Sequence, residues 1–178
     1  QRVVGIDNFD AFYDRSIKER NLQAALSHPG FSFYELDLRV PGCLHVIKEK
    51  PDTVFHLAAK AGVLPSLKDP AAYTENNINA TQHLLDFMKD AGIKNLVFAS
   101  SSSIYGNAGK TPFSETDTNL LPISPYAFTK KSGELLTYVY HHLYKMNVIN
   151  LRFFTVYGEL QRPDLAIHKF TKQILSGK

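Results

Sequence analysis

Tyr126 and Lys130, four residues apart in the run Tyr-Ala-Phe-Thr-Lys, are the residues of this chain whose types and spacing most clearly suggest chemistry. Positions i and i+4 of a helix lie on one face, so both side chains can reach a single site. A free tyrosine titrates near pH ~10 and is a poor base at neutral pH, but a neighbouring cation favours the phenolate. The spacing therefore suggests a tyrosinate base supported by Lys130. The alternative is an ordinary exposed pair on a helix.

Four consecutive serines at positions 100–103 add to this interpretation. They follow the short apolar run 95–99, which is typical of a buried parallel strand. In open α/β sheets, ligands bind at the carboxyl ends of the strands. We therefore expect the serine hydroxyls to lie at a ligand-binding edge, close to the start of the helix that carries Tyr126.

The elements that must position these residues alternate between short apolar runs and helical patterns. The alternation predicts an α/β fold, a Rossmann-like doubly wound parallel sheet with helices on both faces. The predicted strands cover 2–6, 31–36, 53–57, 95–100 and 148–153, and the predicted helices cover 15–27, 41–50, 71–91, 125–146 and 163–177. The Gly, Pro, Ser and Asn residues of 108–125 predict a long surface loop.

Two further strand ends suggest a dinucleotide. Asp7 ends the first predicted strand, where an acid holds the adenosine ribose hydroxyls and favours NAD over its 2'-phosphorylated relative. The alternative is an acid that caps a turn. The third strand ends in Ala58 and Ala59, small residues that allow close approach of a flat cofactor or simply ease helix packing. The glycine-rich phosphate loop should precede the acid by about 20 residues, so we expect a partial domain lacking the first strand and that loop.

Composition excludes several other classes. The 178 residues are 44% hydrophobic, enough for the core of one globular domain, and the net charge of +3 comes from scattered basic residues, which disfavours nucleic-acid binding. Cys43 is the only cysteine, and the seven histidines form no H-x-x-x-H pair, so we expect no internal disulfide and no metal site. No apolar stretch approaches the length of a membrane span and no signal sequence is recognisable, so we expect a cytoplasmic protein without a membrane partner.

Five motifs in order carry a family resemblance. They are the runs 3–9 and 56–59, the serine-rich run 100–106, Tyr126-x-x-x-Lys130 and the run 151–158. Together they closely resemble the extended short-chain dehydrogenase/reductase family, and within it the NAD-dependent nucleotide-sugar epimerases of the UDP-glucuronate 4-epimerase type. The resemblance covers nearly the whole chain. It implies that 1–178 is a partial NAD-binding Rossmann domain, that 155–178 begins the substrate-binding region, and that most of the C-terminal substrate domain is missing.

The same resemblance assigns roles to individual residues. Tyr126 would be the catalytic base and acid, Lys130 would hold the nicotinamide ribose and favour the tyrosinate, and Ser101 would bond the reacting sugar hydroxyl. The residues that would contact the cofactor are Asp7, Asn8, Asp37, Leu38, Leu57, Ala58, Ala59, Asn76, Ser100, Tyr126, Lys130 and Phe154. Those that would contact the substrate are Ser101, Ser102, Tyr126, Thr155 and Arg162. The guanidinium fork of Arg162 suits a carboxylate or a phosphate.

The implied reaction is epimerisation at C4 of a UDP-hexose or UDP-hexuronate, with UDP-glucuronate giving UDP-galacturonate through a transient 4-keto sugar. The family also suggests polysaccharide biosynthesis and a homodimer formed by helices 71–91 and 125–146. Other activities remain open: a 4,6-dehydratase, which would need an acid and a base at positions 102 and 103, where serines stand; a decarboxylase of nucleotide-sugar acids; or a truncated, non-catalytic domain. Lys60, Leu64-Pro65 and 159–161 depart from the usual family pattern near the expected sugar pocket.

Overall fold

The computed structural model describes residues 1–109, 111–118 and 120–177, and the chain divides into two compact units. The first unit comprises 1–35 with 155–178, and the second comprises 36–154. In the first, β1 (Val3–Asp7) pairs in parallel with β2 (Phe31–Glu35). In the second, β3 (Thr53–His56), β4 (Asn95–Ser101) and β5 (Asn147–Phe153) form a parallel sheet in that order. Parallel strands connected through helices confirm the predicted Rossmann-like α/β class.

The first unit contains a βαβ crossover. Helix α1 (Arg15–Leu26) connects β1 to β2, and its N-cap Asp14 accepts a hydrogen bond from the Ser16 amide at 2.8 Å. Arg15 holds the helix to β2 through an ion pair with Glu35 at 2.7 Å, and it also pairs with Glu19 of its own helix at 2.7 Å. Helix α6 (Ala166–Leu175) belongs to the same unit.

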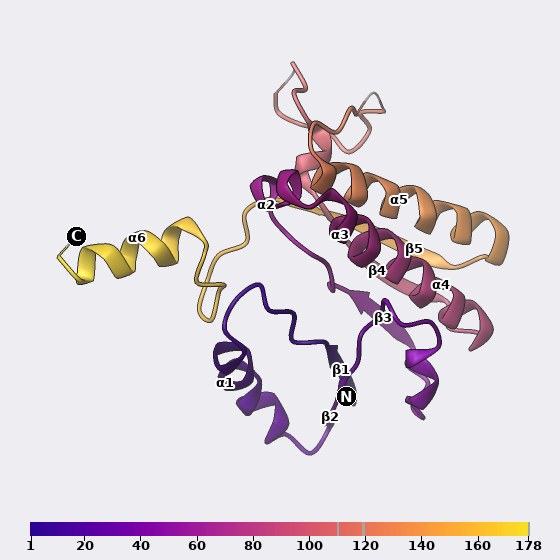
Figure 1. Cartoon of the computed structure of the whole chain (residues 1–178). Helices are drawn as coiled ribbons and strands as arrows, with labels where there is room; N and C mark the ends of the chain where they lie inside the picture. The colour runs from indigo at the N-terminus through magenta and orange to yellow at the C-terminus, as the bar shows by residue number, and fades with distance from the viewer. Residues whose placement is uncertain (110, 119, 178) are drawn as a thin grey trace. The chain divides into compact units, whose positions relative to one another are not determined.

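The core of the second unit lies between its sheet and two helices, α4 (Ala80–Asp90) and α5 (Pro125–Tyr144), which run beside the sheet in Figure 1. Leu85 and Met88 of α4 and Leu96 of β4 are fully buried there. Gly133 allows α5 to approach β4, because a Cβ at this position would lie within 3 Å of the Phe98 ring. Strand β4 is therefore the centre of this unit, and its carboxyl end carries the serine run.

The predicted helix 71–91 is helical, but it has an internal irregularity. It consists of α3 (Pro70–Thr74), a π-helical turn at Glu75–Asn79 and α4. Such turns are rare and recur at functional sites. Two short elements were not predicted, helix α2 (Val63–Lys68) and the 3-10 helix η3 (Ser102–Tyr105) that follows β4 directly.

The predicted helix 41–50 is wrong. Only one 3-10 turn, η1 (Cys43–Val46), forms there. Gly42 precedes it with φ 78°, a left-handed conformation, and Ile47 returns to extended backbone at ψ 119°. Pro51 then disfavours a helical conformation at Lys50, so the helix-favouring residues of 44–50 do not extend the turn into a helix.

Within the described part of the chain, every helix is too short or too polar to span a membrane.

Candidate functional site

The first turns of α5 bring the predicted tyrosine and lysine together. Ser124 caps the helix by accepting a hydrogen bond from the Ala127 amide at 3.1 Å, and Pro125 occupies the first helical turn. Tyr126 is half-buried, and the Lys130 ammonium lies 6.0 Å from its ring centroid. Lys130 is only 5% exposed and donates a hydrogen bond to the Ala99 carbonyl at 2.7 Å. Burial lowers the pKa of Lys130 to about 8.

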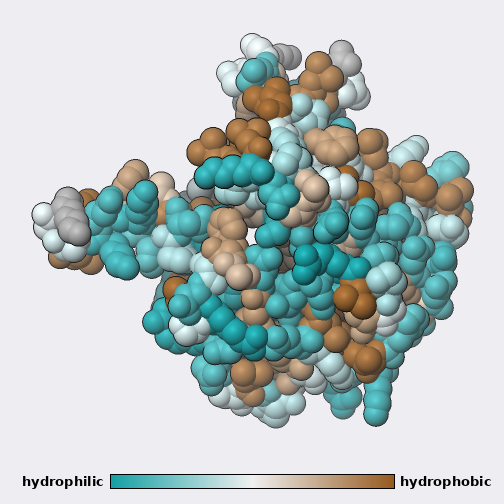
Figure 2. All heavy atoms as spheres, in the orientation of Figure 1, coloured by the Kyte–Doolittle hydropathy of each residue, from teal (hydrophilic) through white to brown (hydrophobic). Residues whose placement is uncertain are grey.

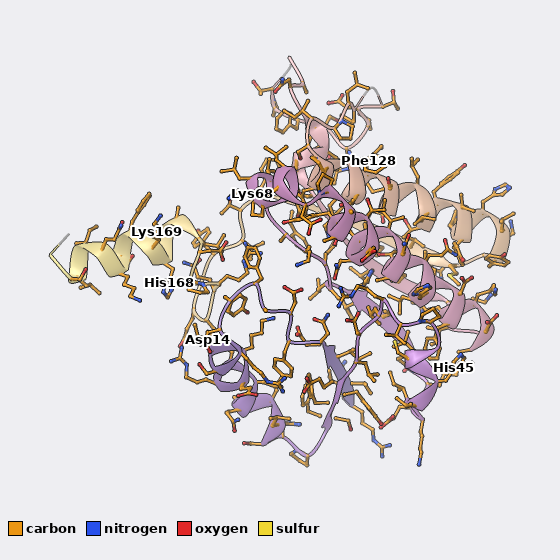
Figure 3. The ribbon with its side chains drawn as sticks, in the orientation of Figure 1. Asp14, His45, Lys68, Phe128, His168 and Lys169 are labelled. Atoms are coloured by element: carbon orange, nitrogen blue, oxygen red, sulfur yellow. The ribbon has the colours of Figure 1, made fainter. Side chains whose placement is uncertain are left out.

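The environment of Tyr126 leaves its hydroxyl available to a ligand. The edge of its ring meets Tyr73 at 6.2 Å between centroids, and the Tyr73 hydroxyl donates to the Ala61 carbonyl at 2.9 Å. Within the described ranges, no protein group makes a hydrogen bond to the Tyr126 hydroxyl. Figure 3 labels Phe128 at the start of α5 and Lys68 on α2, two helices that contact each other.

The serines at the end of β4 differ in their hydrogen-bond partners. Ser101 caps η3: its Oγ accepts from the Ser103 amide at 3.2 Å and donates to the Ser103 Oγ at 3.2 Å. Ser102 is half-buried in η3. The Ser100 hydroxyl donates to Glu134 Oε1 at 2.7 Å. Successive strand side chains point to opposite faces, so the Ser100 side chain points toward α5.

Asn77 is a buried polar residue next to the candidate site, and the sequence analysis did not name it. Its amide oxygen accepts from the Lys60 amide at 2.8 Å, and its amide nitrogen donates to the Lys60 carbonyl at 3.0 Å and to Thr129 Oγ1 at 2.9 Å. Thr129 in turn donates to the Tyr126 carbonyl at 2.9 Å. Asn77 therefore fastens the loop after β3 to the first turn of α5.

The residue named from the sequence, Asn76, donates to the Ala72 carbonyl of the preceding helical turn at 2.8 Å. The π-helical turn directs Asn77 inward, and it is 2% exposed. The sequence signal was a pair of adjacent asparagines within an apolar helical pattern. Helical spacing alone does not decide which of the two faces the core.

The remaining predicted cofactor residues of the second unit lie at loop positions. Leu57, 64% exposed, and the exposed Ala58 follow β3, with Ala59 half-buried beside them. Asp37 forms an ion pair with Arg39 at 2.6 Å, and the Leu38 carbonyl lies 2.9 Å from His83 Nδ1. Phe154 stacks on Phe113 with centroids 6.2 Å apart.

The first unit holds the other predicted residues. Asp7 Oδ1 accepts from the Phe9 amide at 2.6 Å, and Asn8 Oδ1 accepts from the Asp10 amide at 3.0 Å, so both side chains order the turn after β1. The Asp7 side chain is 54% exposed and can still accept from a ligand.

Arg162 and Thr155, the predicted substrate contacts after β5, also belong to the first unit. The Arg162 guanidinium makes a two-point ion pair with Asp164 at 3.0 and 2.9 Å and lies 5.1 Å from the Phe12 ring centroid. Thr155 is exposed. They belong to the same compact unit as Asp7, whereas Tyr126 belongs to the second unit.

Comparison with known proteins identifies the family. The model of the NAD dependent epimerase/dehydratase family matches residues 1–178. The chain belongs to this family. It is 45% identical over 179 aligned residues to the UDP-glucuronate 4-epimerase of Thermodesulfobacterium geofontis, covering 99% of this chain and 55% of the relative. The chain thus spans about half the length of the curated relatives it matches.

Solved structures agree with this assignment. The UDP-glucuronic acid 4-epimerase from Bacillus cereus, in complex with UDP-glucuronic acid and NAD, matches with a TM-score of 0.87 at 40% identity, over 99% of this chain and 56% of that one. A dTDP-glucose 4,6-dehydratase from Streptomyces venezuelae with NAD bound matches with a TM-score of 0.89 at 30% identity, over 99% and 53%. The fold is therefore shared by epimerases and dehydratases.

Each unit by itself carries groups that fit a part of a nicotinamide dinucleotide. The first unit has an exposed carboxylate at the end of β1. The second unit has the exposed Ala58 and the half-buried Ala59 after β3, and a buried ammonium beside a tyrosine at the start of α5. The carboxylate can accept hydrogen bonds from the hydroxyls of one ribose, and the ammonium can bind the second ribose. The small residues leave the backbone open to a flat ring system. Within the ranges described, no three His, Cys, Asp or Glu side chains converge to hold a metal ion.

Proposed function

We propose that the protein is an NAD-dependent epimerase that inverts C4 of a UDP-sugar, and that it converts UDP-glucuronate to UDP-galacturonate. The observation that carries the proposal is the pairing of the buried Lys130 with Tyr126, whose hydroxyl has no hydrogen-bond partner among the residues that the structure describes. The 4-epimerases among the relatives support the reaction class and the choice of sugar.

The residues of this chain would handle the proton. Lys130, held in place by the Ala99 carbonyl, places a positive charge beside the Tyr126 ring. Tyr126 then removes the proton of the sugar 4-hydroxyl, while Ser101 bonds the same oxygen and orients it. Bound NAD would supply the hydride chemistry at C4, as acceptor in the first transfer and donor in the second. Between the two transfers the 4-keto sugar presents its opposite face, and Tyr126 gives its proton back, so the configuration inverts and no cofactor is consumed.

Cofactor contacts are part of the proposal. Asp7 and Asn8 would hold the adenosine ribose, Asp37 and Leu38 would flank the adenine, and Leu57, Ala58, Ala59, Asn76, the Ser100 backbone and Phe154 would line the remainder. Lys130 would bond the nicotinamide ribose. Ser102, Thr155 and Arg162 would contact the sugar nucleotide.

A 4,6-dehydratase is the second candidate, because the fold matches one as well as it matches an epimerase. Elimination of water needs an acid and a base of suitable pKa near C5 and C6. Ser102 and Ser103 occupy the positions after Ser101, and a serine hydroxyl supplies neither group. This disfavours the dehydratase. A decarboxylase of nucleotide-sugar acids is a further alternative, and its product, which has lost carbon dioxide, distinguishes it from the epimerase.

The test is a product assay on the full-length protein with UDP-glucuronate and UDP-glucose in separate reactions. We expect the 4-epimer by chromatography with no net NADH, and no turnover in Tyr126→Phe despite retained NAD. A product that has lost water or carbon dioxide would replace the epimerase with the corresponding alternative. Full turnover by Tyr126→Phe would remove Tyr126 from the chemistry.

We also propose a homodimer, built on an apolar stripe of α5 formed by Leu135, Tyr138, Val139 and Leu143. These side chains are 57, 63, 45 and 59% exposed and recur at helical spacing. Figure 2 shows hydrophobic surface over the part of the molecule where α5 runs. A cytoplasmic location and a role in polysaccharide biosynthesis are in keeping with a single cysteine and with a nucleotide-sugar substrate.

A further inference from the structure

A buried ion pair lies beside the candidate site and has no role in the scheme above. Arg152 of β5 donates to Glu134 of α5 through Nε at 3.0 Å and through Nη2 at 3.1 Å. The two side chains are 16% and 7% exposed. Taking two charges out of water is unfavourable unless further hydrogen bonds satisfy them, and breaking such a pair is strongly destabilising. The groups that complete this pair are therefore informative.

Those groups come from the catalytic end of the sheet. Ser100 of β4 donates to Glu134 Oε1 at 2.7 Å. Arg152 Nη1 donates to the Tyr105 hydroxyl of η3 at 3.2 Å and to the Glu115 carbonyl at 3.4 Å. These contacts join the ends of β4 and β5, η3 and the following loop to α5. The residues whose side chains make them are here named the Glu134 cluster: Ser100, Tyr105, Glu134 and Arg152.

Helical spacing connects this cluster to the catalytic tyrosine. Tyr126, Lys130 and Glu134 are at positions i, i+4 and i+8 of α5, so they lie along one face. Lys130 holds the carbonyl of Ala99, and Glu134 holds the hydroxyl of the next residue, Ser100. The helix that carries Tyr126 is therefore fastened at two consecutive residues to the strand that continues into Ser101.

We propose that Glu134, paired with Arg152, is a positioning residue that fixes Ser101 and Ser102 relative to Tyr126 for the sugar hydroxyl. The inference rests on the proposed function, because it assigns the two serines to substrate. It predicts an effect on chemistry, since a misplacement of 1 Å in such a site costs on the order of 100-fold in rate.

Glu134 remains charged, as this role requires. Burial alone would raise the pKa of Glu134, but the hydrogen bonds from Arg152 and Ser100 outweigh it and lower the pKa of that carboxyl. The ammonium of Lys131, 3.5 Å away, adds to this. The ion pair therefore persists through the neutral range, and Glu134 is a fixed anchor with no proton to exchange near pH 7.

Two variants test the positioning role in the full-length protein with NAD bound. Ser100→Ala removes the contact with the strand and keeps the ion pair, whereas Glu134→Gln keeps the shape and removes the charge. We expect each to lower kcat by about 10- to 100-fold at nearly unchanged KM and NAD content. The double variant should be no slower than the slower single variant, because both changes release the same contact. Lys131→Gln, which removes a cation touching Glu134 without touching Ser100, is the matched control and should keep kcat.

A purely structural role would give a different result. It would lower the melting temperature and the fraction of NAD-loaded enzyme, while kcat per loaded site stayed normal, and that outcome would overturn the proposal. If Glu134→Gln does not fold, Ser100→Ala alone decides, because it leaves no buried charge unpaired.

Hydrogen exchange separates this inference from the proposed function. Amides of β4 and η3, residues 96–108, should exchange faster in Glu134→Gln than in wild type or Lys131→Gln. If the wild type inverts no UDP-sugar, the epimerase is refuted. Faster exchange in Glu134→Gln would still support the anchoring contact in that case. An active wild type combined with unchanged exchange and kcat in Glu134→Gln would refute the anchor.

Discussion

The buried ammonium of Lys130 destabilises the fold at neutral pH. Burial lowers the pKa of Lys130 from its ordinary value of 10.5 to about 8. The unfolded chain therefore binds more protons between these values, so the destabilisation is complete below pH 8 and is relieved as the pH rises toward 10.5. The shift corresponds to about 3 kcal/mol at pH 7.

Lys130→Met should consequently stabilise the protein freed of NAD while abolishing turnover. We expect the free energy of unfolding at pH 7 to rise by about 1–3 kcal/mol, less than the full shift because the Ala99 carbonyl loses its donor. The gain should shrink between pH 8 and 10.5, as measured by urea unfolding. A gain that did not change with pH would show that packing, and not the charge, is responsible.

The side-chain type of Arg162 predicts an anionic partner, but it does not identify which anion the guanidinium binds. Its fork already binds Asp164, whose carboxylate would compete with that of a uronic acid. We expect Arg162→Ala to reduce kcat/KM for UDP-glucuronate by about 10- to 100-fold and that for UDP-glucose much less. Asp164→Asn frees the guanidinium, so it should lower KM for the uronic acid. Equal losses on both sugars in Arg162→Ala would refute carboxylate recognition.

At the scale of elements, the contact of α5 with β4 depends on Gly133. A Cβ there would overlap the Phe98 ring, which is 2% exposed. We expect Gly133→Ala to lower the free energy of unfolding by about 1–3 kcal/mol, although alanine is the better helix former by ~1 kcal/mol.

Two comparisons show whether the Gly133 effect comes from the Phe98 ring. Gly109→Ala is the control, because a Cβ at that position meets nothing within 4 Å. Combining Gly133→Ala with Phe98→Leu should cost less than the sum of the two single changes. Exact additivity in thermal or urea unfolding would show that the ring is not what excludes the methyl group.

The sequence predicted these elements where periodicity is strong and missed them where backbone geometry decides. Strand β4 and helix α5 were expected within a few residues of their observed bounds, since apolar runs and i,i+4 spacing report burial directly. Gly42 and Pro51 ended the predicted helix 41–50 after a single turn, and a π-helical turn buried Asn77, which the sequence analysis did not name.

Glu134 could have been noticed from its sequence position. It lies four residues after Lys130, on the face of α5 that has to meet the sheet, where a carboxylate requires a buried partner. That partner, Arg152, stands within the predicted strand 148–153. Their pairing depends on the register between α5 and β5, which spacing within either element does not report.

At the scale of the whole molecule, the apolar stripe of α5 predicts association. Glutamate at position 135 would place a charge in the middle of the stripe, and burying it unpaired in an interface would be strongly unfavourable. We expect the wild-type protein to elute as a dimer in size-exclusion chromatography with light scattering, and Leu135→Glu to elute as a folded monomer. Leu121→Glu is the matched control, since Leu121 is 78% exposed and lies outside α5. A monomeric wild type would refute the dimer. A dimer that persists in Leu135→Glu would show that the interface lies outside this stripe of α5 and does not cover Leu135, Tyr138 and Leu143.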